Sequence, residues 1–460
     1  MTTKKTRPAA IADPQPDADV HPIRGYQRRP LWHASIPPLA AHDGRPLSEQ
    51  ADVVVVGGGY TGLSAALGLV RSGARVVVLE RERLGWGAST RNGGIVHAGL
   101  KWGHARLRRM FGAELGERVY RAGIENFFEF ERFIEVEDLA TDYRRTGLIV
   151  LAWSRRHLEG LREEAAELAT GGLHGRVVSG SELLDEIGTN HYPGGLVVEE
   201  AGAIHPGRYF AALAGAVSEA GADLYPETPA LAIERGGGGL AVRTPRGSIA
   251  CRDVLLATNG YTDRLLPWLR RRVIPVGSYI IATEPLDEQT AAAISPRGRV
   301  FFDSKNFLYY WRLGPDRRLL FGGRASFTPT SVDRTAAILR QAMHRVHPQT
   351  RRLRIEYAWG GNVGFTFDRL PHIGRHEGIS YALGYCGSGV AMATSFGLYM
   401  ARRLGERSEV AAERSPFEEI THPGVPLVPA VYRERPWFLP PAGELFRAVD
   451  WWSRRDLPTR

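Results

Sequence analysis

Hydrophobic residues between positions 52 and 80 follow two different periods. Residues 53–56 are four consecutive valines, a β-branched run typical of a parallel strand that is buried on both faces. From Leu63 to Leu69 the apolar residues then form the packed face of a helix, and residues 75–79 contain a second apolar strand. The order strand, helix, strand predicts a βαβ unit, around which the rest of the chain is organised.

Three glycines connect the first strand to the helix. Gly57, Gly59 and Gly62 have the spacing G-x-G-x-x-G, which permits a sharp turn, a close approach of backbone amides to a pyrophosphate, and tight packing of helix on strand. The phosphates would lie at a helix N-terminus, where free N–H groups favour negative charge. Glu80 ends the second strand, where a carboxylate can accept both hydroxyls of an adenosine ribose. Because the glycines lie between a strand and a helix, we favour a dinucleotide site over a merely structural βαβ unit.

The rest of the chain alternates helical and β-rich patterns. Helices are expected at residues 104–136, 155–168, 182–187, 206–220 and 331–346, and strands at 146–153 and 253–257. Residues 272–327 are β-rich runs separated by turns, which predicts a mixed sheet. Residues 381–404 repeat the logic of the first motif, with a strand, glycines at 384, 387 and 389, and a helix.

Both ends of the chain lack this periodicity. Residues 1–30 are rich in Pro, Asp and Arg, which predicts a flexible leader. After Leu404 the sequence is rich in Pro and Trp without clear periodicity, and we assign that tail no function. Its large aromatic residues are available to pack on the body of the protein or on a second subunit, so the oligomeric state stays open; they are Trp437, Phe438, Trp451 and Trp452.

Composition narrows the class of protein. The net charge is +9, but 55 arginines are scattered along the whole chain and only four lysines occur, which argues against a nucleic-acid-binding face. Cys251 and Cys386 have no metal-ligand spacing, so no metal is expected. No apolar run approaches the ~18 residues of a membrane span, and the N-terminus lacks a signal-like apolar segment. We expect a cytoplasmic protein with no nucleic-acid partner and no membrane span.

Residues 81–99, RERLGWGASTRNGGIVHAG, form a glycine-rich loop after Glu80, which by itself indicates a surface loop or a loop against a flat ligand equally well. Together, GGGYTGLSAALGL and LERERLGWGASTRNGG resemble the FAD-dependent amine and amino-acid oxidoreductases of the D-amino-acid oxidase superfamily, most closely the γ-glutamylputrescine oxidase branch. The resemblance extends in blocks from about Leu31 to Leu404. It is specific in the two flavin loops and loose between them.

The resemblance implies a fold and a division into parts. The fold class is α/β with α+β character: a Rossmann-like FAD-binding domain interleaved with a mixed-sheet substrate domain. FAD-binding parts are expected at residues 31–140, 201–262 and 355–405. Substrate-domain parts are expected at 141–200 and 263–354, followed by the tail at 406–460.

The resemblance also implies which residues bind FAD. The expected cofactor-binding residues are Gly57, Gly59, Tyr60, Thr61, Gly62, Glu80, Arg81, Ala88, Ser89, Thr90, Arg91, Asn92, Gly93, Gly94, Ala230, Thr258, Asn259, Gly260, Gly387, Ser388, Gly389, Val390 and Ala391. FAD is expected to be non-covalent, because Gly361 and Arg91 stand where related enzymes attach the flavin through Cys or His. The catalytic residues stay unknown, and the substrate-side candidates are Arg324, Tyr279, Tyr309 and Trp359.

In such enzymes the flavin performs the chemistry and the protein supplies geometry and electrostatics. The expected reaction is oxidation of a primary or secondary amine by hydride transfer to flavin N5, after which the imine hydrolyses. The acceptor is oxygen or an electron carrier, because Leu320 stands where sarcosine oxidases place an oxygen-activating lysine. The alternatives are an oxidase or dehydrogenase of D-amino acids or N-methyl amino acids, and a non-catalytic FAD-containing subunit.

The predicted substrate class depends on one absent arginine. Glycine- and D-amino-acid-oxidising relatives bind the substrate carboxylate with an arginine in an R-P-x-x-x-D-x-x-P-like segment. The matching segment here is NVGFTFDRLP, and the nearest position holds Val363. Arg324 or Arg91 would be the replacement. We therefore expect an amine without an α-carboxylate, such as a polyamine or its γ-glutamyl conjugate.

Overall fold

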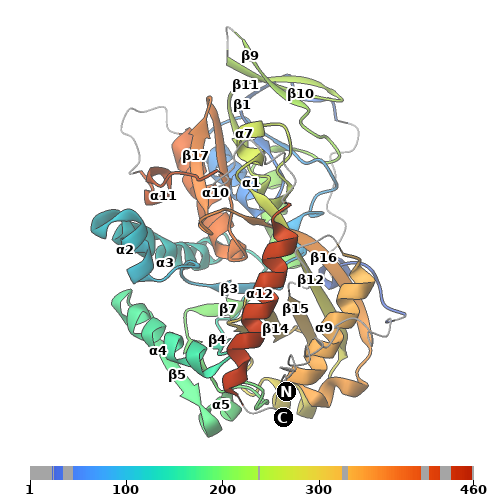
Figure 1. Cartoon of the computed structure of the whole chain (residues 1–460). Helices are drawn as coiled ribbons and strands as arrows, with labels where there is room; N and C mark the ends of the chain where they lie inside the picture. The colour runs from blue at the N-terminus through green and yellow to red at the C-terminus, as the bar shows by residue number, and fades with distance from the viewer. Residues whose placement is uncertain are drawn as a thin grey trace, which may run out of the picture.

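Two eight-stranded sheets form the framework of the molecule (Figure 1). The structure is a computed structural model that describes residues 23, 25–34, 45–236, 239–323, 330–405, 414–424 and 437–457. The mixed α/β fold class expected from the sequence is confirmed. Within the part of the chain that the structure describes, none of the helices combines the length and apolarity that a membrane span needs.

The first sheet is built on the predicted βαβ unit. Its strand order is β17-β18-β11-β1-β2-β8, and the five strands from β18 to β8 are parallel. A hairpin, β9–β10, extends β11. The strand bounds are β1 Gln50–Val56, β2 Val76–Leu79, β8 Asp223–Tyr225, β9 Ala232–Gly236, β10 Gly239–Thr244, β11 Gly247–Leu256, β17 His372–His376 and β18 Ile379–Leu383.

The four valines of β1 are buried because both faces of this sheet are covered. Val53 and Val55 pack into a core with four helices, whereas Val54 and Val56 pack on the opposite face with Leu266. Alternate side chains of a strand point to opposite faces, so an unbroken apolar run is what such a position requires. The four helices are α1 Tyr60–Arg71, α3 Ala113–Val136, α6 Pro206–Glu219 and α10 Gly389–Gly405.

The second sheet has the order β16-β12-β15-β14-β13-β4-β6-β5 and is antiparallel except for the β13–β4 pair. Its strands are β4 Leu148–Leu151, β5 Gly175–Ser179, β6 Gly194–Val198, β12 Ile274–Pro285, β13 Val300–Asp303, β14 Tyr309–Leu313, β15 Arg318–Gly323 and β16 Ile355–Phe365. A third, two-stranded sheet pairs β3 Ile95–His97 with β7 Ala201–Ala203.

Further helices, several of them short, complete the described part of the chain. They are η1 Leu31–Ala34, η2 Ala88–Thr90, α2 His104–Phe111, α4 Arg155–Thr170, α5 Gly180–Glu186, η3 Asn259–Tyr261, α7 Pro267–Arg270, α8 Glu288–Ile294, α9 Val332–Val346, η4 Pro348–Arg352, α11 Pro416–Glu419, α12 Leu439–Ser453 and η5 Arg454–Asp456.

Three expectations need correction. The helical pattern at 104–136 is two helices, because Gly112 has φ +85 and ends α2 before α3 begins. The expected boundary after residue 354 is wrong for β16, which pairs with β12 from Ile274 to Thr283 and so belongs to the second sheet. The tail expected to lack periodicity contains α12, in which Gly443 and Asp450 are buried while Trp451 and Trp452 stay exposed.

The expected leader is described only near its end. Gln27 forms an isolated bridge to β16, where its main-chain N–H donates to the carbonyl oxygen of Glu356 and its carbonyl oxygen accepts from the N–H of Ala358. The following Leu31 and Trp32 are buried against β12 and β16. The buried Leu31 and Trp32 therefore follow directly on the predicted leader, of which the structure describes residues 23 and 25–30.

Candidate active site

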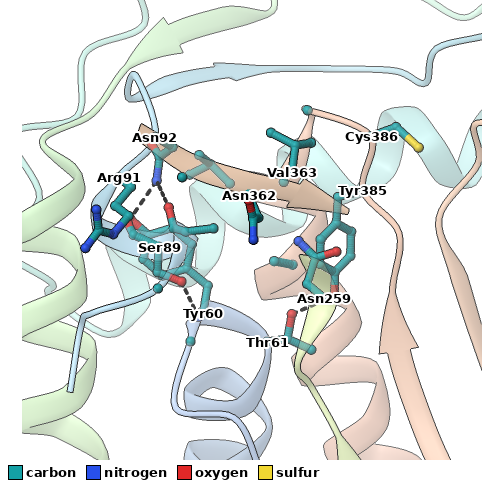
Figure 2. Close-up of a pocket in the computed structure, with 18 of the residues that line it drawn as sticks. Tyr60, Thr61, Ser89, Arg91, Asn92, Asn259, Asn362, Val363, Tyr385 and Cys386 are labelled. Carbon is teal, nitrogen blue, oxygen red and sulfur yellow. Dashed lines mark hydrogen bonds between the residues drawn. The ribbon is translucent and has the colours of Figure 1, made fainter. Parts of the chain in front are cut away.

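A cavity of about 550 Å³ runs from the first sheet to the second. Its wall includes the glycine turn after β1, the end of β2, the 85–93 loop, the turn after β11, and the N-terminus of α10. Its far end is lined by β3, β4, β13, the 304–308 turn and α4. Figure 2 shows Arg91, Ser89 and Asn92 on one side of it and Asn259, Tyr385 and Thr61 on the other. Asn362 and Val363 of β16 lie between the two groups.

The glycine turn keeps backbone, with no side chain, at the cavity surface. Gly57 has φ +109, and a Cβ there would lie 2.8 Å from the carbonyl oxygen of Ala257. A Cβ on Gly62 would lie 2.0 Å from the carbonyl oxygen of Gly57, so α1 could not approach the turn with any larger residue. Gly62 itself faces β1 and does not line the cavity, which is the packing role expected for the third glycine.

Glu80 is held at the cavity wall by two amides. Its carboxylate accepts hydrogen bonds from the N–H of Gly58 at 2.9 Å and of Glu82 at 3.0 Å. Burial raises the pKa of Glu80, although these two amides act in the opposite direction. Each carboxylate oxygen can accept a further hydrogen bond, so the group has capacity left for hydroxyls of a ligand.

The loop around η2 is fixed by hydrogen bonds within itself and to α1. Ser89 Oγ accepts from the N–H of Tyr60 at 3.0 Å, and Asn92 Nδ2 donates to the carbonyl oxygens of Ala88 and Ser89. Asn92 Oδ1 accepts from the N–H of Gly94 at 2.8 Å. This loop is therefore part of the wall, and the alternative interpretation of residues 81–99 as an ordinary surface loop is wrong for 85–93.

A buried arginine outside the cavity supports that loop. Arg312 of β14 donates from Nε to the carbonyl oxygen of Gly93 and from Nη2 to that of Ile204, both at 2.7 Å. Burial lowers the pKa of Arg312 to about 10. Its guanidinium also lies 5.3 Å from the ring of Trp32. Arg312 thus connects the second sheet to the loop of the first.

Arg91, a predicted cofactor residue, lines the cavity and donates from two of its nitrogens to main-chain carbonyl oxygens. Nε donates to the carbonyl oxygen of Trp86 at 2.6 Å, and Nη1 donates to that of Gly360 at 2.9 Å. The guanidinium also lies 5.0 Å from the ring of Trp86, and burial lowers the pKa of Arg91. The side chain holds β16 against the loop.

The opposite wall contains a second helix N-terminus. Asn259 adopts φ +41, and its Oδ1 accepts from the N–H of Gly384 at 3.0 Å. Thr61 and Tyr385 share a hydroxyl hydrogen bond of 2.6 Å that joins α1 to the turn before α10. Gly387, Ser388, Gly389 and Val390 line the cavity at the start of α10. Two helix N-termini therefore face one space, and both favour negative charge there.

The far end of the cavity carries polar groups that are mostly paired. Ser278 and Tyr310 share a hydroxyl hydrogen bond of 2.9 Å. Lys305 Nζ lies 3.1 Å from Asp303 Oδ2, and both side chains are almost completely buried. Burial raises the pKa of Asp303, and Lys305 opposes that shift. Glu164 of α4 also lines this end.

Most of the predicted cofactor residues line this one cavity. They are Gly57, Gly59, Tyr60, Thr61, Glu80, Arg81, Ala88, Ser89, Arg91, Asn92, Gly93, Ala230, Thr258, Asn259, Gly387, Ser388, Gly389 and Val390. The other five, which lie behind the wall, are Gly62, Thr90, Gly94, Gly260 and Ala391. Thr90, for example, is buried and donates its hydroxyl to the carbonyl oxygen of Gly85.

The predicted substrate-side aromatic residues do not line the cavity. Tyr279 donates its hydroxyl to the carbonyl oxygen of Thr330, and Trp359 Nε1 donates to the carbonyl oxygen of Arg91. The ring of Tyr309 packs against Lys305, whose Nζ lies 3.1 Å from the ring centre. For Tyr279 and Tyr309 the strand register explains the error, because successive side chains point to opposite faces. Ser278 and Tyr310, each one position away, are the residues that line the cavity. Arg324 lies outside the described residues.

Sequence reasoning also missed several wall residues. Tyr261, whose hydroxyl accepts from the N–H of Asn362 at 3.1 Å, and Lys305 carried no motif. Strand parity around the two predicted tyrosines could have found Ser278 and Tyr310. Among the described residues, no group of three or more His, Cys, Asp or Glu side chains is placed to hold a metal ion.

Comparisons with known proteins agree with this geometry. Residues 52–403 match the model of the FAD dependent oxidoreductase (DAO) family. The chain is 33% identical over 364 residues to the probable oxidoreductase OrdL of Haemophilus influenzae, covering 77% of this chain and 83% of that protein. It is 31% identical to the gamma-glutamylputrescine oxidoreductase of Escherichia coli over 376 residues, or 81% and 88% of the two chains.

The fold resembles that of a solved structure. The crystal structure of glycine oxidase from Geobacillus kaustophilus superposes with a TM-score of 0.69 at 22% identity, covering 82% of this chain and all of that one. The chain belongs to the DAO family of FAD-dependent oxidoreductases, whose members act on amines or amino acids. It is therefore an FAD-dependent oxidoreductase, as the sequence motifs predicted.

Proposed function

We propose that this protein oxidises a primary or secondary amine whose reacting carbon carries no carboxylate, and that its FAD is held without a covalent bond. When bound, FAD supplies the acceptor for the hydride that leaves the carbon next to the amine nitrogen. The resulting imine then hydrolyses in water. The chain's own residues bind both partners, orient them and set the charge of the cavity.

The cavity suits FAD because it offers bare backbone and two helix N-termini. The turn at Gly57 and Gly59 would hold the pyrophosphate on α1, and Glu80 would accept the ribose hydroxyls. A Cβ at Gly57 would already collide with protein backbone, so this surface can only be glycine. The N-terminus of α10 would stabilise negative charge on the ring. The loop held by Arg312 would line the ring's other side.

The observation that carries the substrate class is the side chain at position 363. Val363 lines the cavity, and the motif resemblance aligns it with the arginine of carboxylate-binding relatives. The nearby Arg91 is a weaker replacement, because its Nε and Nη1 already donate to the carbonyl oxygens of Trp86 and Gly360. A carboxylate bound here would forfeit a charge-assisted pair worth roughly 1.5–3 kcal/mol, or about ten- to a hundredfold in affinity.

The charges at the far end support the same proposal. Lys305, which could otherwise bind a carboxylate, is paired with Asp303. The hydroxyls of Ser278 and Tyr310 and the amide of Asn362 are neutral groups that can contact a neutral amine. The similarity to a gamma-glutamylputrescine oxidoreductase favours a long alkyl amine or its γ-glutamyl conjugate.

The alternative is an amino-acid oxidase or dehydrogenase, favoured by the 25% identity to the glycine oxidase of Geobacillus kaustophilus over 82% of this chain. Anaerobic stopped-flow reduction of the bound flavin separates the two, using matched pairs such as pentylamine and norleucine, or putrescine and ornithine. We expect faster reduction by the member without a carboxylate. A consistent preference for the amino acids would refute the proposal.

A matched variant sharpens this test. Val363→Arg places a guanidinium at the position that the carboxylate-binding relatives use, and Val363→Leu controls for the added volume. We expect Val363→Arg, and not Val363→Leu, to shift the preference at least about tenfold toward the amino acid of each pair. An equal effect of both substitutions would mean that the residue acts only through its size.

A further inference from the structure

The C-terminal helix α12 lies outside the residues that match the family and is attached to the substrate end of the cavity. The family match ends at residue 403, whereas α12 spans Leu439–Ser453. Figure 1 shows this helix in red, lying across the second sheet near β4 and β14. Its inward residue Asp450 is only 6% exposed.

Asp450 binds the turn between β13 and β14. Its Oδ1 accepts hydrogen bonds from the main-chain N–H and the Nδ2 of Asn306, both at 2.9 Å. Its Oδ2 accepts from the N–H of Phe307 at 3.0 Å. One buried carboxylate thus accepts from two consecutive amides of a five-residue turn that has no helix or strand of its own.

The other residues of the same turn form part of the cavity wall. Ser304, Lys305 and Leu308 line the cavity, whereas Asn306 and Phe307 face α12. Lys305 projects over the ring of Tyr309 at 3.1 Å, where it also reaches Asp303. The shape of the turn therefore decides where these three wall residues stand.

The end of α12 and the η5 turn after it make a second attachment, to Trp153 and to the start of α4. The main-chain carbonyl of Asp450 accepts from Trp153 Nε1 at 2.7 Å, and the guanidinium of Arg454 lies 4.0 Å from the same ring. Asp456 Oδ2 accepts from the N–H of Arg155 at 2.8 Å, at the start of α4. That helix supplies Leu161 and Glu164 to the cavity.

We propose that α12 is a strap that fixes the substrate end of the active site, and that Asp450 is its principal positioning residue. The proposal rests on the proposed amine oxidation for its substrate. Asp450 does not line the cavity, so it acts only through the turn that it binds. Loss of its carboxylate should weaken amine binding while FAD stays bound, because the hydrogen bonds described for the glycine turn and for the turn before α10 join them to η2, to one another and to Asn259.

The test compares four holoenzymes: wild type, Asp450→Ala, Asp450→Asn and Leu445→Ala. Asp450→Asn keeps one acceptor oxygen and the side-chain shape, so it should retain part of the function. It also provides the test if Asp450→Ala does not fold. Leu445 is exposed on the outer face of the same helix and is the matched control. The probes are putrescine, spermidine and γ-glutamylputrescine, with anaerobic flavin reduction and amide hydrogen exchange as the two readouts.

In Asp450→Ala we expect faster exchange at residues 304–308 and a half-saturating amine concentration raised about tenfold or more. The limiting reduction rate should stay within about threefold and the flavin content should be unchanged, with Asp450→Asn intermediate and Leu445→Ala like wild type. An unchanged half-saturating concentration in Asp450→Ala would overturn the strap proposal.

The two proposals fail in different ways. If none of the three amines reduces the wild-type flavin, the proposed substrate class is wrong. Amide hydrogen exchange then still tests the strap proposal. Exchange at 304–308 that is the same in Asp450→Ala and wild type would then overturn it. Faster exchange confined to that turn would support it.

Discussion

Replacing Arg312 with Met should lower FAD affinity without touching the cavity surface. The substitution keeps a flexible side chain near Trp32 but removes the donors that bind the carbonyl oxygens of Gly93 and Ile204, both at 2.7 Å. Hydrogen bonds from a charged donor are worth roughly 1.5–3 kcal/mol each, so two give about 3–6 kcal/mol before compensation.

Compensation reduces that figure. Burial of the guanidinium is itself unfavourable, as its lowered pKa of about 10 indicates, and Met relieves that cost. We take about 1.5–3 kcal/mol as the net loss, shared between folding stability and the position of the 85–93 loop. If half or more of this free-energy loss acts through displacement of the 85–93 loop, FAD should bind about three- to a hundredfold more weakly.

The assay is titration of the apoprotein with FAD, followed by quenching of flavin fluorescence, together with thermal unfolding of the holoenzyme. Arg402→Met is the matched control, because this exposed arginine makes one ion pair, with Glu129 at 3.0 Å, at the far end of α10. Binding of FAD by Arg312→Met within twofold of the control would refute the reasoning that this residue supports the cofactor loop.

Three further predictions follow from the same site. Acid precipitation should release FAD into the supernatant, because Arg91 and Gly361 occupy the positions used for covalent attachment; flavin in the pellet would contradict this. Gly62→Ala should abolish FAD retention and lower the unfolding temperature, since its Cβ would lie 2.0 Å from a backbone oxygen, so wild-type flavin content in that variant would exclude the packing role. Burial lowers the pKa of His205 to about 4, whereas the unfolded state has an ordinary histidine pKa near 6.5. Between these two pH values the unfolded state therefore binds more protons than the folded state. Stability should therefore fall as the pH falls from 6.5 to 4, with a smaller fall in His205→Gln, as measured by thermal unfolding across that range.

Local sequence patterns predicted the βαβ unit of the first sheet and its glycine turn, whereas the loop at 85–93 was assigned to the cofactor by the family resemblance. Four consecutive valines can be satisfied only by a strand with both faces covered, and the glycine spacing requires a turn and a helix after it. These signals are local, because strand, turn and helix are adjacent in the chain. They located the residues at the cavity surface in the turn after β1 and at the start of α10 without any knowledge of the remaining fold.

The substrate end depended on information that local patterns do not contain. Whether Tyr309 or Tyr310 lines the cavity is decided by the register of β14 against β15, and a shift of one residue reverses every side chain. The roles of Arg312 and Asp450 arise from contacts between residues more than 100 positions apart. Only the tertiary structure brings these partners together, because the chemistry of an arginine or an aspartate in the sequence does not specify which distant carbonyl or amide it will meet.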